Sequence, residues 1–357
     1  MIGDSDSCMA GWDLKCGLIT KYDLDEEYIW SLFNYVFSDE CRKRNTYKFG
    51  LIKAILDNVF SGKSKEQGIY YTYEQLFVKF AENYWNLVVK YHLCQMRKDG
   101  KSEYSKIEKI FQEATTENPL LSILEFASIE EGKRTSIIKL VVQECKKNVI
   151  GALYNDFDGT IYSFDLKESG LTLNPCVYEF ILKYKYELEK INYYSWARML
   201  EQINNDDVLI RVINKLELST PRRDNLSVYR EILRKEFEEN TCFYCGKKLQ
   251  KSIHVDHFIP WSFVKDDKIW NLVLSCAECN ERKNSKIPVK NYLVKIENRN
   301  KKVQTINNVI VQSDFSGYSN DLLDRMWHYA KLSGMKEYTV YSNQLLQGDI
   351  VSFVRYH

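Results

Sequence analysis

Two Cys-x-x-Cys pairs constrain the fold of this chain more than any other feature. Cys242 and Cys245 form the first pair, and Cys276 and Cys279 form the second. Four thiolates in two such knuckles make a closed tetrahedral set for Zn²⁺, which is the geometry of a structural rather than a catalytic site. The 30 residues between the pairs (246–275) exceed the usual ribbon spacing of about 15–20. A further element is therefore inserted between the knuckles.

The segment between and after the knuckles has the pattern of two strands and a helix. The run Lys251–Ile259 is β-branched and apolar and predicts a strand, and Leu272–Leu274 predicts a second one. Helical residues follow from Ala277 to Lys286 and stop before Pro288. The order strand, long loop, strand, helix therefore describes a small module that a zinc site closes.

The first predicted strand carries an Asp-His pair. Side chains alternate along a strand, so His254 and Asp256 share one face and His257 lies on the other. Asp256 and His257 can serve one site only if the strand ends or bends at this point. Pro260 is consistent with such an exit from the strand.

These residues resemble the HNH (ββα-metal) endonuclease family. The matching pattern is Val-Asp256-His257-Phe-Ile-Pro, then Asn271, then Cys-Asn280-x-x-Lys283, and its spacing also resembles the HNH domain of RNA-guided CRISPR nucleases. The resemblance implies that Asp256 ligates a divalent metal and that His257 is the general base. It also implies that Asn271 braces the loop between the strands and that Asn280 is the second metal ligand. The name-giving pattern has His at this last position, and an Asn ligand is weaker.

The function implied by the resemblance is hydrolysis of phosphodiester bonds in DNA, with Mg²⁺ or Mn²⁺ as the catalytic metal and Zn²⁺ as the structural one. Two alternatives stay open: a nuclease of the same chemistry that cleaves RNA or tRNA, and a non-catalytic zinc module that binds nucleic acid or a protein partner. The sequence also leaves open whether the protein is a homodimer or needs an activating partner.

Basic residues gather near the predicted site. Residues 242–302 hold 13 Lys/Arg and 6 Asp/Glu, a net charge of +7, whereas the remainder holds 37 and 43, a net of −6. We expect phosphate contacts from Arg282, Lys283 and Lys286 on the helix, although a solvated helix face has the same pattern. His254 is a candidate for supporting the metal ligands, and a structural, hydrogen-bonded role suits it equally well.

The composition indicates a folded protein of the cytoplasm. Apolar residues make up 45% of the chain, and no run approaches the 18 or more apolar residues of a membrane span. The first 15 residues contain acidic side chains and no apolar core, so they do not resemble a signal peptide. The six cysteines outside the knuckles are scattered, as expected of reduced thiols. No membrane association is expected.

The predicted fold class is α+β, with three parts: a mainly helical N-terminal region (1–235), the nuclease module (236–300) and a C-terminal extension that packs on the module (301–357). The apolar periodicity predicts N-terminal helices at Glu26–Glu40, around Ile52–Val59, after an N-cap at Thr72, and at 106–115, 135–150, 176–190, 194–204, 206–217 and 225–239, with a small hairpin at Thr160–Leu173. In the C-terminal part the pattern predicts a β pair at Tyr292–Glu297 and Val303–Val311, and a helix at Asp321–Leu332 that ends at Gly334.

The N-terminal region contains a basic stretch, Arg42–Lys48 (RKRNTYK). A solvated turn and a contact with nucleic acid or a partner are equally compatible with it. The layout is similar to that of a group of bacterial HNH proteins with a helical N-terminal region, an Asn-Thr/Ser-Tyr-Lys helix start, and segments like Tyr194–Glu201 and Arg223–Arg230. Such proteins are often associated with defence against phage or with mobile elements.

Overall fold

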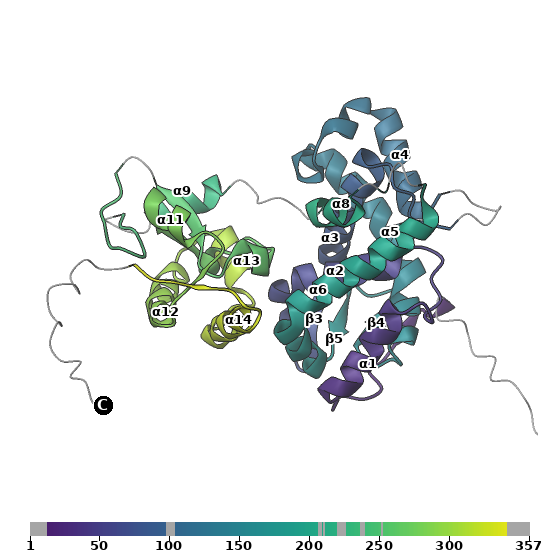
Figure 1. Ribbon diagram of the computed structural model, residues 1–357, viewed down its shortest axis with the longest axis horizontal. Coiled ribbons are helices and arrows are strands. Elements are labelled where there is room, and N and C mark those ends of the chain that lie inside the picture. Colours follow the sequence, from purple (N-terminus) through teal and green to yellow (C-terminus); the bar gives the residue numbers. More distant parts are fainter. Residues whose placement is uncertain are drawn as a thin grey trace, which may run out of the picture. The chain divides into compact units, whose positions relative to one another are not determined.

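The computed structural model describes residues 13–97, 104–205, 209, 211–219, 226–235, 240–250 and 253–340. The chain divides into two compact units (Figure 1). Unit 1 comprises Met1–Asp224 with Val264–Asp266, and unit 2 comprises Asn225–Phe263 with Asp267–His357. The sequence predicts boundaries after residues 235 and 300. In the structure, the helix of residues 227–235 and the described C-terminal residues 301–340 belong to unit 2.

Unit 1 is mainly helical, as the sequence predicts, and the overall class is α+β. Its helices are α1 (Glu26–Phe37), α2 (Tyr47–Asn58), α3 (Tyr73–Trp85), α4 (Lys106–Glu117), α5 (Glu131–Asp156), α6 (Pro175–Ile203) and α8 (Val212–Ser219). The predicted N-cap at Thr72 is confirmed, because its side chain accepts a hydrogen bond from the Gln75 backbone N–H in a capping box. The two helices predicted at 176–190 and 194–204 form the single helix α6, which is kinked at Tyr184.

A five-stranded antiparallel sheet accompanies these helices, in the order β1-β4-β5-β3-β2. Its strands are β1 (Cys16–Gly17), β2 (Lys63–Lys65), β3 (Gly68–Thr72), β4 (Tyr162–Asp165) and β5 (Gly170–Leu173). The sequence predicts only the hairpin β4–β5, because two- and three-residue strands such as β1 and β2 are too short to show an alternating pattern. β3 pairs with β5 at Gly170, where a Cβ atom would lie 2.1 Å from the carbonyl oxygen of Tyr71.

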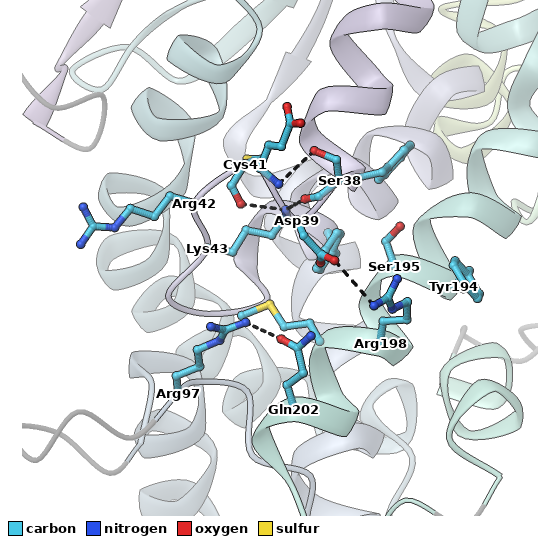
Figure 2. A pocket seen from close by; sticks show the side chains of 14 residues that line it. Ser38, Asp39, Cys41, Arg42, Lys43, Arg97, Tyr194, Ser195, Arg198 and Gln202 are labelled. Atoms are coloured by element: carbon cyan, nitrogen blue, oxygen red, sulfur yellow. Dashed lines mark hydrogen bonds and ion pairs between the residues drawn. The ribbon is translucent and has the colours of Figure 1, made fainter.

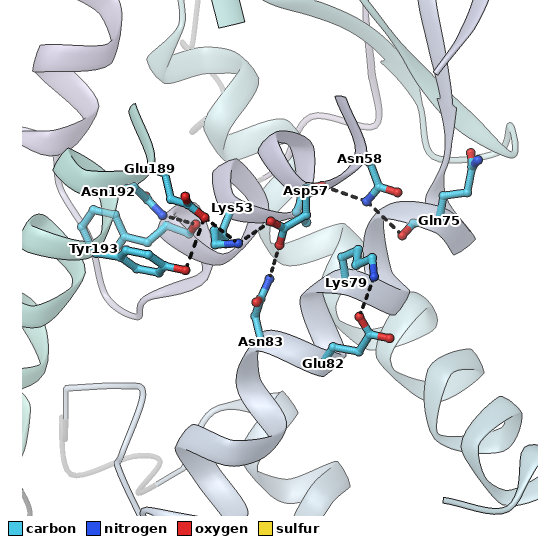
Figure 3. Close-up of polar contacts among 12 residues, drawn as sticks. Lys53, Asp57, Asn58, Gln75, Lys79, Glu82, Asn83, Glu189, Asn192 and Tyr193 are labelled. Atoms are coloured by element: carbon cyan, nitrogen blue, oxygen red, sulfur yellow. Dashed lines mark hydrogen bonds and ion pairs between the residues drawn. The ribbon is translucent and has the colours of Figure 1, made fainter. Parts of the chain in front are cut away.

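Helix α2 runs through the core of unit 1, and nearly all of its residues are buried. Two of them are charged: the Lys53 ammonium contacts the Asp57 carboxylate one helical turn away and lies 3.2 Å from Glu189 on α6 (Figure 3). Asn83 on α3 donates a further hydrogen bond of 3.0 Å to Asp57. The buried charges are therefore paired and hydrogen-bonded, which is the condition under which a core tolerates them.

Unit 2 contains two strands and a helix in the predicted order. Its elements are α9 (Ser227–Lys235), β6 (His254–His257), α10 (Trp261–Val264), β7 (Leu272–Ser275), α11 (Ala277–Lys283), β8 (Ile287–Pro288), α12 (Asn291–Val303), α13 (Val309–Phe315), α14 (Asn320–Leu332) and β9 (Glu337–Tyr338). β6 and β7 form an antiparallel pair, in which Asp256 lies opposite Val273 and His257 opposite Leu272. β8 and β9 form a second, parallel pair.

The prediction of a β pair at Tyr292–Glu297 and Val303–Val311 is wrong, because these residues lie in helices α12 and α13 and the turn between them. The side chains buried along α12 are Leu293, Ile296, Asn300 and Val303, which recur at the helical spacing of three or four. A strand would place Val294 on the same face as Ile296, yet Val294 is 62% exposed. The predicted helix that ends before Gly334 is confirmed as α14, whose N-cap is Ser319.

Parts of three predicted elements lie outside the described residues: the start of the helix predicted at 206–217, the end of the one at 225–239, and the start of the strand Lys251–Ile259. None of the helices in the described parts of the chain is long and apolar enough to cross a membrane.

Candidate active site

The four cysteines of the two knuckles converge on one point in unit 2. All four Sγ atoms lie within 4.8 Å of one another, and those of Cys245 and Cys276 are 3.9 Å apart. Zn–S bonds of about 2.3 Å in a tetrahedron separate sulfur atoms by roughly 3.8 Å. The cluster therefore has the dimensions of a structural zinc site.

Local backbone structure places each knuckle. In the first knuckle, the Gly246 N–H donates a hydrogen bond of 2.9 Å to the Cys242 carbonyl. Gly246 has a positive φ of +71°, which this tight turn needs and which glycine adopts readily. In the second, Cys276 is the N-cap of α11, and its Sγ accepts a hydrogen bond from the Cys279 N–H. Four cysteine sulfur atoms are also chemically suited to bind a cation. Burial raises the pKa of the Cys279 thiol, so a bound cation is needed to keep a buried thiolate at neutral pH.

Strand β6 ends at His257, and both members of the Asp-His pair still lie in its ladder with β7. Asp256 and His257 are both buried, with 8% and 2% of their surfaces exposed. Beyond the strand end the chain turns, and the side chain of Asn271 holds the turn in place. Its Oδ1 atom accepts a hydrogen bond of 2.8 Å from the Ile259 N–H, and its Nδ2 atom donates one of 2.9 Å to the Ile259 carbonyl. This is the geometry of a brace between the two strands.

Two side chains hold the Asp256 carboxylate. The Tyr244 hydroxyl donates a hydrogen bond of 2.5 Å to its Oδ2 atom, and the Lys283 ammonium lies 3.0 Å from the same oxygen. Burial, and then the neighbouring Asp256 charge, raise the pKa of Tyr244, so the phenol stays a donor. Tyr244 lies between Cys242 and Cys245 in the first knuckle. The fold of this knuckle therefore also positions the hydroxyl that donates to Asp256. No sequence pattern pointed to this contact.

Lys283 departs from the expectation of a phosphate contact. Its side chain is fully buried, and its ammonium donates 2.6 Å to the His257 carbonyl in addition to pairing with Asp256. The reason is its position on α11, whose inner face packs on β6 and aims a long side chain at the strand. Arg282 is exposed on the same helix, and Lys286 is half-exposed in the turn that follows the end of the helix at Lys283; a phosphate can reach both.

His257 has a carboxylate partner that the sequence analysis missed. Its Nε2 atom lies 2.5 Å from Oδ1 of Asp267, in the loop between the two strands. The main-chain carbonyl of Asp267 in turn accepts a hydrogen bond of 3.0 Å from the hydroxyl of Tyr229 on α9. A carboxylate on one ring nitrogen orients a histidine and sets which nitrogen is left for other chemistry. No described residue makes a hydrogen bond to the other ring nitrogen, Nδ1.

The loop that carries Asn271 rests on the C-terminal helices. The Ile269 N–H donates a hydrogen bond of 2.8 Å to the carboxylate of Asp314 on α13. The Trp270 indole N–H donates one of 3.0 Å to the main-chain carbonyl of Asp314. From α12, Arg299 and Asn300 donate hydrogen bonds to main-chain carbonyls of the same loop. The C-terminal segment thus packs on the ββα elements.

The two remaining predicted residues lie on β6 and α11. His254 is the first residue of β6, half-buried and opposite Ser275. Asn280 is half-buried in the first half of α11, directly after Cys279.

A comparison with protein-family models agrees with the order of these residues, the ββα topology and the cysteine cluster. Residues 242–289 match the HNH endonuclease family model. No curated protein gave a significant match, and neither did any solved structure. Residues 242–289 therefore form an HNH endonuclease domain that carries a four-cysteine cluster, and a mainly helical N-terminal region precedes it.

Proposed function

We propose that the protein is a metal-dependent endonuclease that hydrolyses phosphodiester bonds in DNA. The observation that carries this proposal is the buried Asp256–His257 pair at the end of β6. Tyr244 holds the Asp256 carboxylate, and Asp267 holds the His257 ring. A site of this kind is preorganised, because its groups need little rearrangement before the reaction.

His257 is the general base in this mechanism. Asp267 holds Nε2, which leaves Nδ1 to accept the proton of the attacking water. A positioned base of this type accelerates a reaction by about 10²–10⁴. Asn271 contributes by fixing the turn after β6, so that the ring of His257 keeps its place relative to Asp256.

The residues around Asp256 fit a divalent cation. Both protein partners of this carboxylate bond to Oδ2, and no described residue bonds to Oδ1. Asp256 and Asn280 would hold one Mg²⁺ or Mn²⁺ ion, with His254 as a candidate for supporting them. Oxygen ligands of this type suit Mg²⁺. When bound, the ion supplies positive charge at the phosphoryl oxygens. The four cysteines would hold Zn²⁺ as a separate, structural ion.

Arg282 on α11 and Lys286 in the turn after it are the phosphate contacts that we retain, since both side chains reach the surface. They bind the backbone without reading the sequence, as basic side chains do in nucleic-acid interfaces. The similarity of the N-terminal region to that of bacterial HNH proteins supports a role in defence or in mobile elements. RNA cleavage by the same residues is the second candidate.

Plasmid nicking tests the proposal. Purified protein incubated with Mg²⁺ or Mn²⁺ should convert supercoiled plasmid to the nicked form, and a single-stranded RNA should remain intact. EDTA should stop the reaction, and added Mg²⁺ should restore it while elemental analysis still finds one zinc per chain. Cleavage that persists in EDTA would refute the mechanism, and cleavage of the RNA alone would favour the second candidate.

A further inference from the structure

A cavity of about 570 Å³ lies in unit 1 where α1 ends (Figure 2). Several of its charged side chains are engaged within the protein. Arg198 lies 3.6 Å from Asp39, and the Lys43 ammonium donates a hydrogen bond of 2.6 Å to the Ser38 carbonyl. Because these groups already have partners, the cavity does not indicate a particular ligand. Unit 2, in contrast, contains buried contacts beside the proposed active site that the ββα elements do not account for.

One segment of unit 2 carries both side chains that fix the proposed general base. At its start, the Asp267 carboxylate lies 2.5 Å from Nε2 of His257. At its end, Asn271 braces the turn after β6 through two hydrogen bonds to Ile259. We call residues 267–271 the bracing segment. The orientation of the His257 ring therefore depends on where the bracing segment lies relative to β6.

Asp314 on α13 holds the middle of the bracing segment. Its Oδ2 atom accepts a hydrogen bond of 2.8 Å from the Ile269 N–H, and the residue is buried. The Lys268 ammonium lies 3.8 Å from the other carboxylate oxygen, Oδ1. The main-chain carbonyl of Asp314 accepts a hydrogen bond of 3.0 Å from the Trp270 indole. Asp314 thus contacts three consecutive residues of the bracing segment.

The Asp314 carboxylate satisfies a main-chain group that the bracing segment does not satisfy by itself. Ile269 begins a short 3₁₀ helix, η6 (Ile269–Asn271), and the N–H groups at the start of a helix have no partner within it. Lys268, the N-cap residue of η6, makes no side-chain cap. Ile269 is fully buried, so its N–H would be costly without an acceptor. Asp314 supplies that acceptor from a different helix.

A second contact reaches the bracing segment from α9. The hydroxyl of Tyr229 donates a hydrogen bond of 3.0 Å to the main-chain carbonyl of Asp267. Tyr229 and Asp314 both belong to unit 2, yet both lie outside residues 242–289, which match the family model. The supports of His257 therefore extend beyond the family-matched residues on both sides of the sequence.

We propose that Asp314 is a positioning residue of the nuclease site and that it acts on His257 through the bracing segment. Without its carboxylate, the Ile269 N–H loses its acceptor and the bracing segment shifts relative to β6. The Asp267 carboxylate then no longer fixes the ring. A misplacement of about 1 Å in a catalytic group can lower a rate by about 10². This proposal rests on the proposed function, in which His257 is the general base.

The ring nitrogens of His257 give a readout that does not depend on cleavage. In full-length, zinc-loaded protein labelled with ¹⁵N-histidine, NMR at mildly alkaline pH should find the wild-type ring neutral with its hydrogen on Nε2, because Asp267 accepts at that atom. Asp314→Ala should instead give a mixture of both tautomers. The His257→Gln protein assigns the signals. A contact that only added stability would lower the melting temperature and leave the tautomer unchanged.

Plasmid cleavage gives the second readout. Asp314→Ala should lower the single-turnover rate at saturating plasmid by about 10–100-fold, as for other groups that orient a functional histidine. The plasmid concentration that gives half the maximal rate should change little, because Asp314 positions the base and not the substrate. Asp314→Asn keeps a side-chain oxygen that can accept from the Ile269 N–H. It should therefore retain most of the rate and the single tautomer.

Two further variants complete the test. Tyr229→Phe removes one hydroxyl from the other support of the bracing segment, so it should change both readouts in the same direction but less. It takes the place of Asp314→Ala if circular dichroism melts show that this variant unfolds. Ser319→Ala is the matched control, because it removes the hydroxyl that caps α14 by accepting 3.0 Å from the Leu322 N–H. It should leave the rate and the tautomer unchanged.

The proposal is overturned if folded Asp314→Ala keeps the wild-type tautomer or the wild-type rate, or if Ser319→Ala alters both readouts equally. The same outcome in Tyr229→Phe overturns it if Asp314→Ala does not fold. A wild-type protein that cleaves neither DNA nor RNA would count against the proposed function instead. The tautomer of His257 alone would then decide whether Asp314 positions the ring.

Discussion

The Nε2 atom of His257 lies 2.5 Å from Oδ1 of Asp267, ten residues further along the chain. The contact joins the end of β6 to the loop that leads into β7. It gives the proposed general base a fixed ring orientation, in the way that a carboxylate orients the histidine of a catalytic triad.

Replacement of His257 by Ala should abolish plasmid cleavage while zinc content is retained. The loss should be about 10²–10⁴ in the single-turnover rate, which is the usual contribution of a positioned base. Asp267→Ala should lower the rate by a smaller factor, on the order of 10–100, as for other groups that orient a functional histidine. His254→Ala serves as the comparison and should cost less than His257→Ala. A larger loss in His254→Ala would exchange the two roles.

Cys279 and Asn280 are neighbours in sequence, and we expect them to serve different metals. Structural zinc contributes on the order of 10 kcal/mol to small zinc modules, against a total stability of roughly 5–15 kcal/mol for a domain. Cys279→Ser should therefore lose zinc and expose residues 240–290 to protease. Asn280→Ala should keep its zinc and its melting temperature but lose cleavage, with partial rescue by Mn²⁺. An Asn280→Ala protein that unfolds would contradict this division.

Lys283→Met should destabilise unit 2, because it leaves the buried Asp256 carboxylate without its cation. Removing one partner of a buried ion pair typically costs about 3–5 kcal/mol. Added Mg²⁺ should recover part of the loss by supplying positive charge at Asp256, and thermal melts with and without Mg²⁺ measure this. Lys286→Met, three residues further along the chain and nearer to the surface, is the matched control and should change the melt little. Equal melts for the two variants would argue against the pair as a source of stability.

Glu189 in unit 1 should make the protein sensitive to acid. Burial opposes its charge, but Lys53 and then Lys185 outweigh burial and lower the pKa of Glu189 to about 2, from an ordinary value of 4.5. Its stabilisation, on the order of 3 kcal/mol, is complete above the unfolded pKa and is lost as the pH falls from about 4.5 to about 2. Urea midpoints measured across this range should fall less steeply in Glu189→Gln. Glu201→Gln, an exposed change on the same helix, should keep the wild-type slope.

The predictability of the site follows from how local each feature is. The cysteines of structural zinc sites typically lie in closely spaced pairs, so the sequence alone identified the four-cysteine cluster, and its sulfur atoms do converge. The Asp-His pair and Asn271 follow a strand-loop-strand order that local patterns also reveal. Asp267 and Tyr244 were missed because their partners depend on how a loop and a knuckle fold back over β6.

The C-terminal segment shows the limit of local patterns more clearly. Alternating apolar residues near Val294 predicted a strand, but the packing of α12 beneath the Asn271 loop selects the helical period and leaves Val294 exposed. The sequence by itself determined the helical character of unit 1, the four-cysteine cluster and the order of the HNH residues, because spacing along the chain sets these. Only the tertiary structure decided which charges are buried, as for Lys283 and Lys53, because burial depends on what packs against a side chain.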